Sequence, residues 1–104
     1  MKLIAIETAT GKRFPVREAG ETWILVQTGK QSYVYEQVGE HYTLHISTCL
    51  FDQHGREILD VDRLRDRTGD EWKVTWDGKQ WSIFWTMYPV LLTTELAATM
   101  EVVE

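Results

Sequence analysis

The seven glycines of this sequence recur at positions 11, 20, 29, 39, 55, 69 and 78, and their spacing constrains the fold more than any other feature. Between them lie short runs rich in Val, Ile, Thr, Tyr, Trp and Phe, the residue types that are enriched in strands. Short apolar runs separated by turns about every ten residues are typical of all-β proteins. We therefore expect a mainly β fold, a small antiparallel β-barrel or sandwich of six to eight strands joined by meander-like hairpins.

The length of 104 residues and the composition fit one domain. A chain of this size can bury roughly two thirds of the surface that its unfolded form exposes, which is enough for one core. No Gly/Ser tract, proline cluster or long run of like charge marks a linker. We expect a single β-rich domain over residues 1–104, in which the apolar run Trp23–Val26 is a strand buried on both faces.

Two segments depart from the strand pattern. Residues 60–68 could hold one short helix, because Asp60 or Asp62 could cap its start and a glycine follows its end. The tail over residues 93–104 fits either a short helix after a threonine cap or a last strand, and the sequence leaves both open.

Four of the five tryptophans lie in "EWKVTWDGKQWSIFW", residues 71–85. Asp77-Gly78 is a strong hairpin signal between the two halves of this stretch. A loop of two or four residues is even in length, so either loop keeps the same set of side chains together. We expect six apolar side chains on one face of the hairpin: Trp72, Val74, Trp76, Trp81, Ile83 and Trp85.

This tryptophan face has both a structural and a functional interpretation. Opposed aromatic side chains stabilise a small sheet, and buried indoles would supply its core. Tryptophan is also enriched at the centres of protein interfaces. We expect Trp76 and Trp81, nearest the turn, to be exposed, and Trp72 and Trp85 to be buried. The candidate protein-binding residues are Trp76, Lys79, Trp81, Asp70 and Glu71.

Potential metal ligands and nucleophiles are present but poorly spaced. His41, His45 and Cys49 fall on an alternating apolar and polar run that predicts a strand, where residues four apart lie roughly 13 Å from each other. Zinc ligands must all lie within about 2.3 Å of one ion. His54 is a fourth possible ligand and does not change this conclusion. We expect no metal site, no cofactor, no catalytic residues and no enzymatic activity.

The charge balance favours a protein partner. The sequence carries 16 acidic and 11 basic residues, a net charge of −5, which repels phosphate backbones and suits a basic protein surface. No stretch approaches the roughly 20 apolar residues that cross a bilayer. A single cysteine allows no disulfide within the chain, and Glu7 breaks the N-terminal apolar run that a secretion signal would need. We therefore expect a cytoplasmic protein that binds neither nucleic acid nor membrane.

These observations favour a small, acidic, non-enzymatic binding protein that acts through a protein–protein interface on a larger, basic partner. An inhibitor, an immunity protein or a phage anti-defence protein would have this size and charge. Two alternatives stay open. One is a β-barrel that binds a small apolar ligand in an aromatic-lined cavity. The other is a self-assembling structural subunit.

Overall fold

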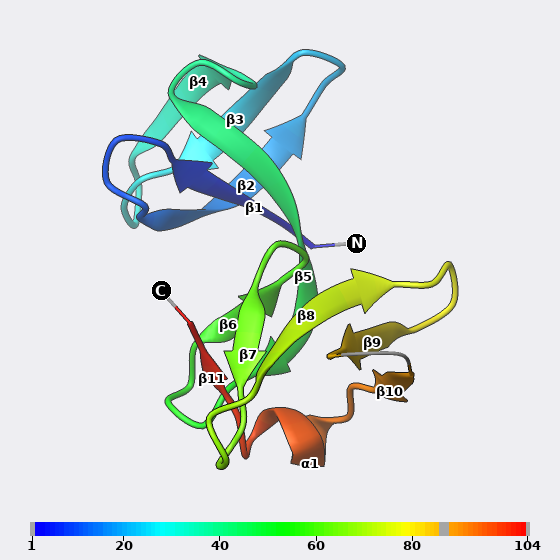
Figure 1. Ribbon diagram of the computed structural model, residues 1–104. Helices are drawn as coiled ribbons and strands as arrows, with labels where there is room; N and C mark the ends of the chain where they lie inside the picture. The colour runs from blue at the N-terminus through cyan, green and yellow to red at the C-terminus, as the bar shows by residue number, and fades with distance from the viewer. Residues whose placement is uncertain (1, 86–87, 104) are drawn as a thin grey trace. The chain divides into compact units, whose positions relative to one another are not determined.

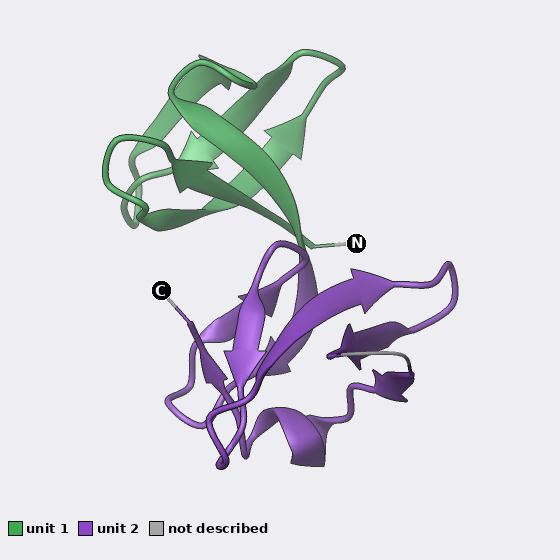
Figure 2. Cartoon of the chain, in the orientation of Figure 1, with its two compact units in different colours: residues 1–46 green, residues 47–104 purple. Residues whose placement is uncertain are grey.

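The computed structural model describes residues 2–85 and 88–103. In these ranges the chain forms eleven β-strands, all paired antiparallel, and one short helix, so the predicted mainly β class is confirmed. The chain divides into two compact units, residues 1–46 and 47–104 (Figure 2). That residues 1–104 form a single domain stays a prediction.

The first unit is a meander with a returning strand. Its strands β1 to β4 pair in sequence, and β5 then comes back to pair with β1, which gives the order β4-β3-β2-β1-β5. The core holds Ala5, Ile24, Val26 and Tyr42. The elements are β1 (Leu3–Glu7), β2 (Arg13–Ala19), β3 (Trp23–Gln27), β4 (Tyr33–Gln37) and β5 (Tyr42–Phe51), whose first half belongs to this unit (Figure 1).

The prediction that Trp23–Val26 is buried on both faces is wrong. Ile24 and Val26 are fully buried, whereas Trp23 and Leu25 lie on the opposite, more exposed side of β3. Only one face of β3 packs on the core, and Trp23 and Leu25 lie on its solvent-facing side although they are apolar.

The second unit repeats this strand order. Strands β7 to β10 pair in sequence and β11 returns to β7, which gives β10-β9-β8-β7-β11. The second half of β5 pairs separately with β6. The elements are β6 (Glu57–Leu59), β7 (Arg63–Arg65), β8 (Glu71–Trp76), β9 (Trp81–Phe84), β10 (Pro89–Leu91), α1 (Thr94–Ala97) and β11 (Glu101–Val102) (Figure 1).

The strand count differs from the predicted six to eight because four strands, β6, β7, β10 and β11, have three residues or fewer. Runs this short show no readable period of two. Among the described residues, β4 and β6 are the edge strands of one sheet, and β10 and β11 are those of the other. In neither sheet do the two edge strands pair with each other, so the choice between barrel and sandwich stays a prediction.

The helix predicted near residues 60–68 does not form, because aspartate side chains hold the backbone in turns on either side of β7. The Asp62 carboxylate accepts the Leu59 N–H at 2.7 Å. The Asp66 carboxylate accepts the N–H groups of Thr68 at 2.9 Å and Asp70 at 3.0 Å. Such side-chain bonds to nearby backbone compete with helix formation.

The helix lies instead in the tail. The tail forms a short helix and then a strand, the two alternatives that the sequence left open. The Thr93 hydroxyl accepts the Leu96 N–H at 3.1 Å and caps α1. The chain then enters β11 at Glu101 and pairs with β7.

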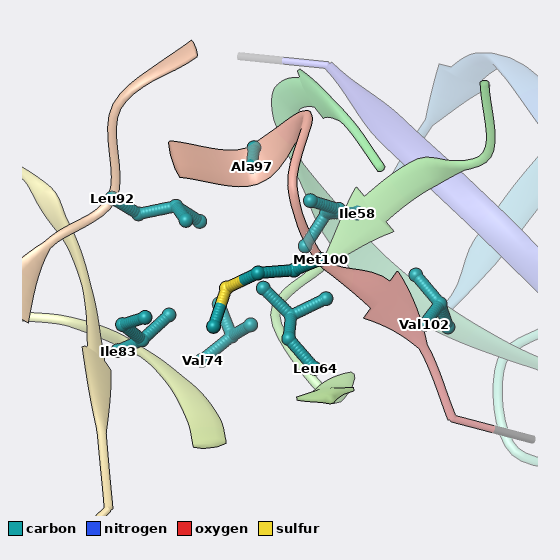
Figure 3. Packing of buried hydrophobic residues seen from close by; sticks show 8 residues of the cluster. All are labelled: Ile58, Leu64, Val74, Ile83, Leu92, Ala97, Met100 and Val102. Carbon is teal, nitrogen blue, oxygen red and sulfur yellow. The ribbon is translucent and has the colours of Figure 1, made fainter. Parts of the chain in front are cut away.

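The core of the second unit forms around Met100, which directly precedes β11. Figure 3 shows its side chain reaching towards Val74, with Leu92 and Ile83 on one side and Leu64 on the other. The complete buried cluster is Ile58, Leu64, Val74, Ile83, Leu92, Ala97, Met100 and Val102.

The buried Asp52 carboxylate ties two distant parts of the second unit together. It accepts the N–H groups of His54 at 2.9 Å and Arg56 at 2.8 Å within the β5–β6 turn, and that of Val102 in β11 at 2.9 Å. Burial alone would raise the pKa of this group. The three backbone N–H groups, with Val102 contributing most, outweigh that effect and lower the pKa below the ordinary value of 3.8.

We predict that Asp52→Asn lowers the free energy of unfolding by about 2–3 kcal/mol, because it replaces charge-assisted bonds and leaves buried N–H groups poorly paired. Because the folded-state pKa is lowered, the carboxylate stabilises the fold above pH 3.8 and loses this effect as the pH falls through the folded-state value. The measurement is urea unfolding followed by tryptophan fluorescence, with exposed Glu21→Gln as the control. A variant as stable as the parent protein at pH 7 would contradict the assigned role.

Candidate functional site

The tryptophan hairpin forms as predicted. Strands β8 and β9 pair with Val74 opposite Ile83 and Trp76 opposite Trp81, so the loop has the four residues 77–80. This register places the four indoles of residues 71–85 on the face that also carries the two buried aliphatic side chains. The long β8–β9 ribbon is visible in Figure 1.

The face is core at its centre and surface at both ends. The rings of Trp76 and Trp81 lie 4.9 Å apart near the turn, and those of Trp72 and Trp85 lie 5.9 Å apart at the other end. Trp76 is 51% exposed and so is Trp85, while their partners are half-buried. The prediction that Trp85 is buried is wrong, because β9 ends at Phe84 and Trp85 follows in a bend. The prediction that Trp81 is exposed is also wrong, because Trp81 is half-buried and packs against the core cluster of the second unit.

The turn is held by the Asp77 carboxylate, which accepts the N–H groups of Gln80 and Lys79, each at 2.8 Å. These bonds lower the pKa of Asp77. Gly78 adopts a φ of 95°, a left-handed conformation that glycine reaches without strain. The exposed Lys79 therefore lies in a turn whose backbone is held by hydrogen bonds.

The structure separates the predicted binding residues into two groups. Trp76, Lys79 and Trp81 lie at the turn, whereas Asp70 and Glu71 lie at the start of β8, about 17 Å away along the strand at 3.3 Å per residue. Glu71 approaches the Arg65 guanidinium at 3.9 Å. Asp70 accepts a hydrogen bond from the Thr68 hydroxyl at 3.1 Å. The acidic pair therefore does not share a surface with the residues at the turn.

An open pocket of about 420 Å³ lies in the second unit. Its apolar wall combines side chains from β8, β9, β10 and the α1 region, and its polar rim is the β7–β8 turn. It is lined by Trp72, Ile83, Val90, Leu96, Met100, Thr99, Asp66, Arg67 and Thr68. Sequence reasoning missed this pocket, because its walls come from segments up to 34 positions apart, from Asp66 to Met100.

The Asp66 carboxylate fixes one wall of the pocket. It accepts the Thr68 hydroxyl at 2.6 Å and the indole N–H of Trp72 at 2.9 Å. These two hydrogen bonds are the main reason that the pKa of Asp66 falls to about 2. Trp72 is thereby held in place, while the exposed Arg67 next along the chain has no ion-pair partner in the described ranges.

A second surface borders the pocket. We define the β9–β10 surface as the exposed apolar side chains of Phe84, Trp85, Tyr88, Val90 and Leu91. In the register of β9 and β10, Val90 shares the face of Ile83, whereas Leu91 and Phe84 lie on the opposite face, so these side chains cover both sides of the edge strand β10. Exposed apolar patches of this kind mark interaction sites more often than scattered single residues do. The sequence signal was the apolar run of residues 87–92 around Pro89, which lacks the alternation of a strand with one buried face.

The histidines and the cysteine lie in separate surroundings. His41 contacts Glu36 at 3.2 Å, His45 contacts the Thr43 hydroxyl at 2.7 Å, and His54 contacts Glu101 at 3.2 Å. Cys49 is exposed and has a φ of 60°. Residues 2–85 and 88–103 contain no group of three His, Cys, Asp or Glu side chains placed to hold a metal ion.

Comparison of the sequence with protein-family models and with curated proteins gave no match. In the described part of the chain, no helix combines the length and the apolar character needed to cross a membrane. Function is therefore argued from the geometry of the chain itself.

We predict that the indole N–H resonance of Trp72 titrates with a midpoint at about pH 2 in a proton–nitrogen correlation spectrum, because Asp66 protonates there. The interaction between Asp66 and this indole is present above pH 3.8 and is lost as the pH falls through about 2. Asp66→Asn removes this titration, and the resonance of Trp23, which lies in the first unit, serves as the internal control. A Trp72 midpoint at the ordinary aspartate value would contradict the assignment.

Proposed function

We propose that this protein is a small, non-enzymatic binding protein that acts through a protein–protein interface in the cytoplasm. The interface is centred on the β9–β10 surface and the neighbouring pocket. The observation that carries the proposal is the succession of exposed aromatic and aliphatic side chains along β9 and β10, among them Tyr88 at 76% and Trp85 at 51% exposure, which includes Val90 on the wall of an open apolar pocket.

The chemistry of this surface resembles the centre of a protein interface. Tryptophan, tyrosine and phenylalanine are enriched at such centres, and a small number of residues in well-packed pockets contribute most of the binding energy. The pocket beside Trp72 offers an apolar recess for one anchoring side chain of a partner. The exposed rings of Trp85 and Tyr88 would enclose that contact and exclude water.

The partner docks through side chains rather than by adding a strand to the sheet. The Leu92 N–H donates to the Trp81 carbonyl at 3.0 Å, so by alternation the backbone groups of Val90 also face β9. Those of Pro89 and Leu91 face the open edge. Since proline has no N–H, only Leu91 offers a donor there, and the edge is a poor template for strand addition.

The charge of the second unit supports a basic partner. Residues 47–104 contain 11 acidic and six basic residues, the whole net charge of −5, whereas residues 1–46 contain five of each. Asp70 and Glu71, next along the chain from the Asp66–Thr68 rim of the pocket, contribute to this field. Negative potential around an apolar centre would steer a larger, basic protein towards the site. A protein that covers part of the surface of such a partner could act as an inhibitor, an immunity protein or an anti-defence protein.

The pocket also favours a second candidate function, the binding of a small apolar ligand. Its volume of about 420 Å³ lies within the range of small-molecule sites, roughly 300–1,000 Å³. Arg67 at the rim would suit a ligand with an anionic end. Native mass spectrometry of the purified protein distinguishes the two, because a small ligand adds a defined mass. Light scattering would reveal a self-assembling subunit as a discrete oligomer.

We predict that Leu91→Asp abolishes capture of the partner, because it places a charge within the apolar contact. The partner is first identified by co-purification from native cells, and binding to each purified variant is then measured by calorimetry. The matched control is Val61→Asp, since Val61 is 54% exposed against 48% for Leu91 but lies in the β6–β7 turn. Trp85→Ala is expected to weaken binding by about 2 kcal/mol or more.

Equal loss in both aspartate variants would show a general effect of charge and not a specific surface. Full binding by Leu91→Asp and Trp85→Ala would place the interface elsewhere and contradict the proposal.

A further inference from the structure

A separate aromatic face lies in the first unit, on the outer side of β3 and β4. Direct pairing across these strands puts Trp23 opposite Gln37, Leu25 opposite Tyr35, and Gln27 opposite Tyr33. Paired residues share a face of the sheet, and the buried Ile24 and Val26 point the other way. The face therefore carries three aromatic rings and two amides.

The rings form a platform that is held in place. The centroids of Trp23 and Tyr35 lie 5.7 Å apart with the planes tilted by 60°, and Tyr35 is 70% exposed. The indole of Trp23 lies so close over Gly20 that a Cβ at that position would collide with it. The Arg17 guanidinium lies over the Tyr33 ring, 5.8 Å from its centroid, and bounds one end.

Polar side chains surround the platform with mixed hydrogen-bonding capacity. Glu18 pairs across β2 and β3 with Leu25, so its carboxylate borders the same face. Gln27 and Gln37 each offer an amide donor and an acceptor, Arg17 offers donors only, and Glu18 offers acceptors only. The side chains of Glu18, Gln27 and Gln37 make no hydrogen bond to other described residues.

This mixture discriminates among ligands that stack on aromatic rings. Phosphate oxygens and the carbonyls of a proline-rich peptide only accept hydrogen bonds, so neither uses a carboxylate acceptor, and phosphate is repelled by it. A single-strand site also needs a positive groove, whereas residues 1–46 carry no net charge. Sugar hydroxyl groups both donate and accept, and the C–H faces of a pyranose ring are apolar.

We propose that the outer face of β3–β4 binds a neutral carbohydrate, with a sugar ring stacked on Trp23 and Tyr35. The hydroxyl groups donate to Glu18 and to the amide oxygens of Gln27 and Gln37, and accept from the amide nitrogens and from Arg17. The site uses no residue of the protein-binding surface in the second unit, so either function can fail without the other.

The test uses the full chain and an array of neutral oligosaccharides, followed by calorimetry with the best hexasaccharide. Tyr35→Ala is expected to weaken binding about tenfold or more, because one stacking surface is removed. Gly20→Ala displaces the Trp23 indole without deleting it and is expected to weaken binding to a similar extent. The matched control is Phe51→Ala, which removes an exposed aromatic ring outside both proposed surfaces and leaves sugar binding unchanged.

Circular dichroism shows whether each variant is folded, and Tyr35→Phe, which keeps the ring, retains binding. Absence of binding to any neutral oligosaccharide on the array overturns the proposal. So does binding of oligothymidylate or a proline-rich peptide in place of sugar, if that binding is lost in Tyr35→Ala. Sugar binding that Tyr35→Ala and Gly20→Ala leave intact overturns the assigned site.

Discussion

The buried carboxylate of Asp52 is the interaction on which the second unit depends. It joins the turn after β5 to β11, and β11 in turn pairs with β7, next to the strand that carries Trp72, Val74 and Trp76. A buried charge is costly unless it is fully hydrogen-bonded, and three backbone N–H groups meet that requirement. The tryptophan face and the pocket are thus built on a sheet whose last strand is anchored by one side chain.

Aspartates shape the rest of this unit in the same way. Asp62, Asp66 and Asp77 each accept backbone N–H groups in a turn, and Asp66 also fixes the indole that forms a wall of the pocket. Much of the negative charge of residues 47–104 is therefore structural in origin. This charge still contributes to the field around the β9–β10 surface, because the carboxylates of Asp66 and Asp77, whose pKa values are lowered, stay ionised at neutral pH.

The two units share one strand order, four strands in sequence and a fifth that returns to the first. Exposed aromatic side chains lie on the third and fourth strands of the first unit, Trp23 on β3 and Tyr33 and Tyr35 on β4, and on the third strand of the second unit, Phe84 on β9. The chemistry beside them differs. Amides and a balanced charge accompany the rings of β3–β4, whereas aliphatic side chains and a net negative charge accompany those of the β9–β10 surface. One arrangement of strands thus presents two surfaces suited to different ligands.

The sequence alone determined the β class, the hairpin at Asp77-Gly78 and the shared face of its four indoles, because turn chemistry and a period of two act between near neighbours. Only the tertiary structure decided that Trp85 is exposed, that residues 60–68 form turns and a strand, and that Asp66, Val90 and Met100 line one pocket. Burial and pocket walls depend on contacts between residues far apart in the chain, and no local pattern encodes which of these residues meet.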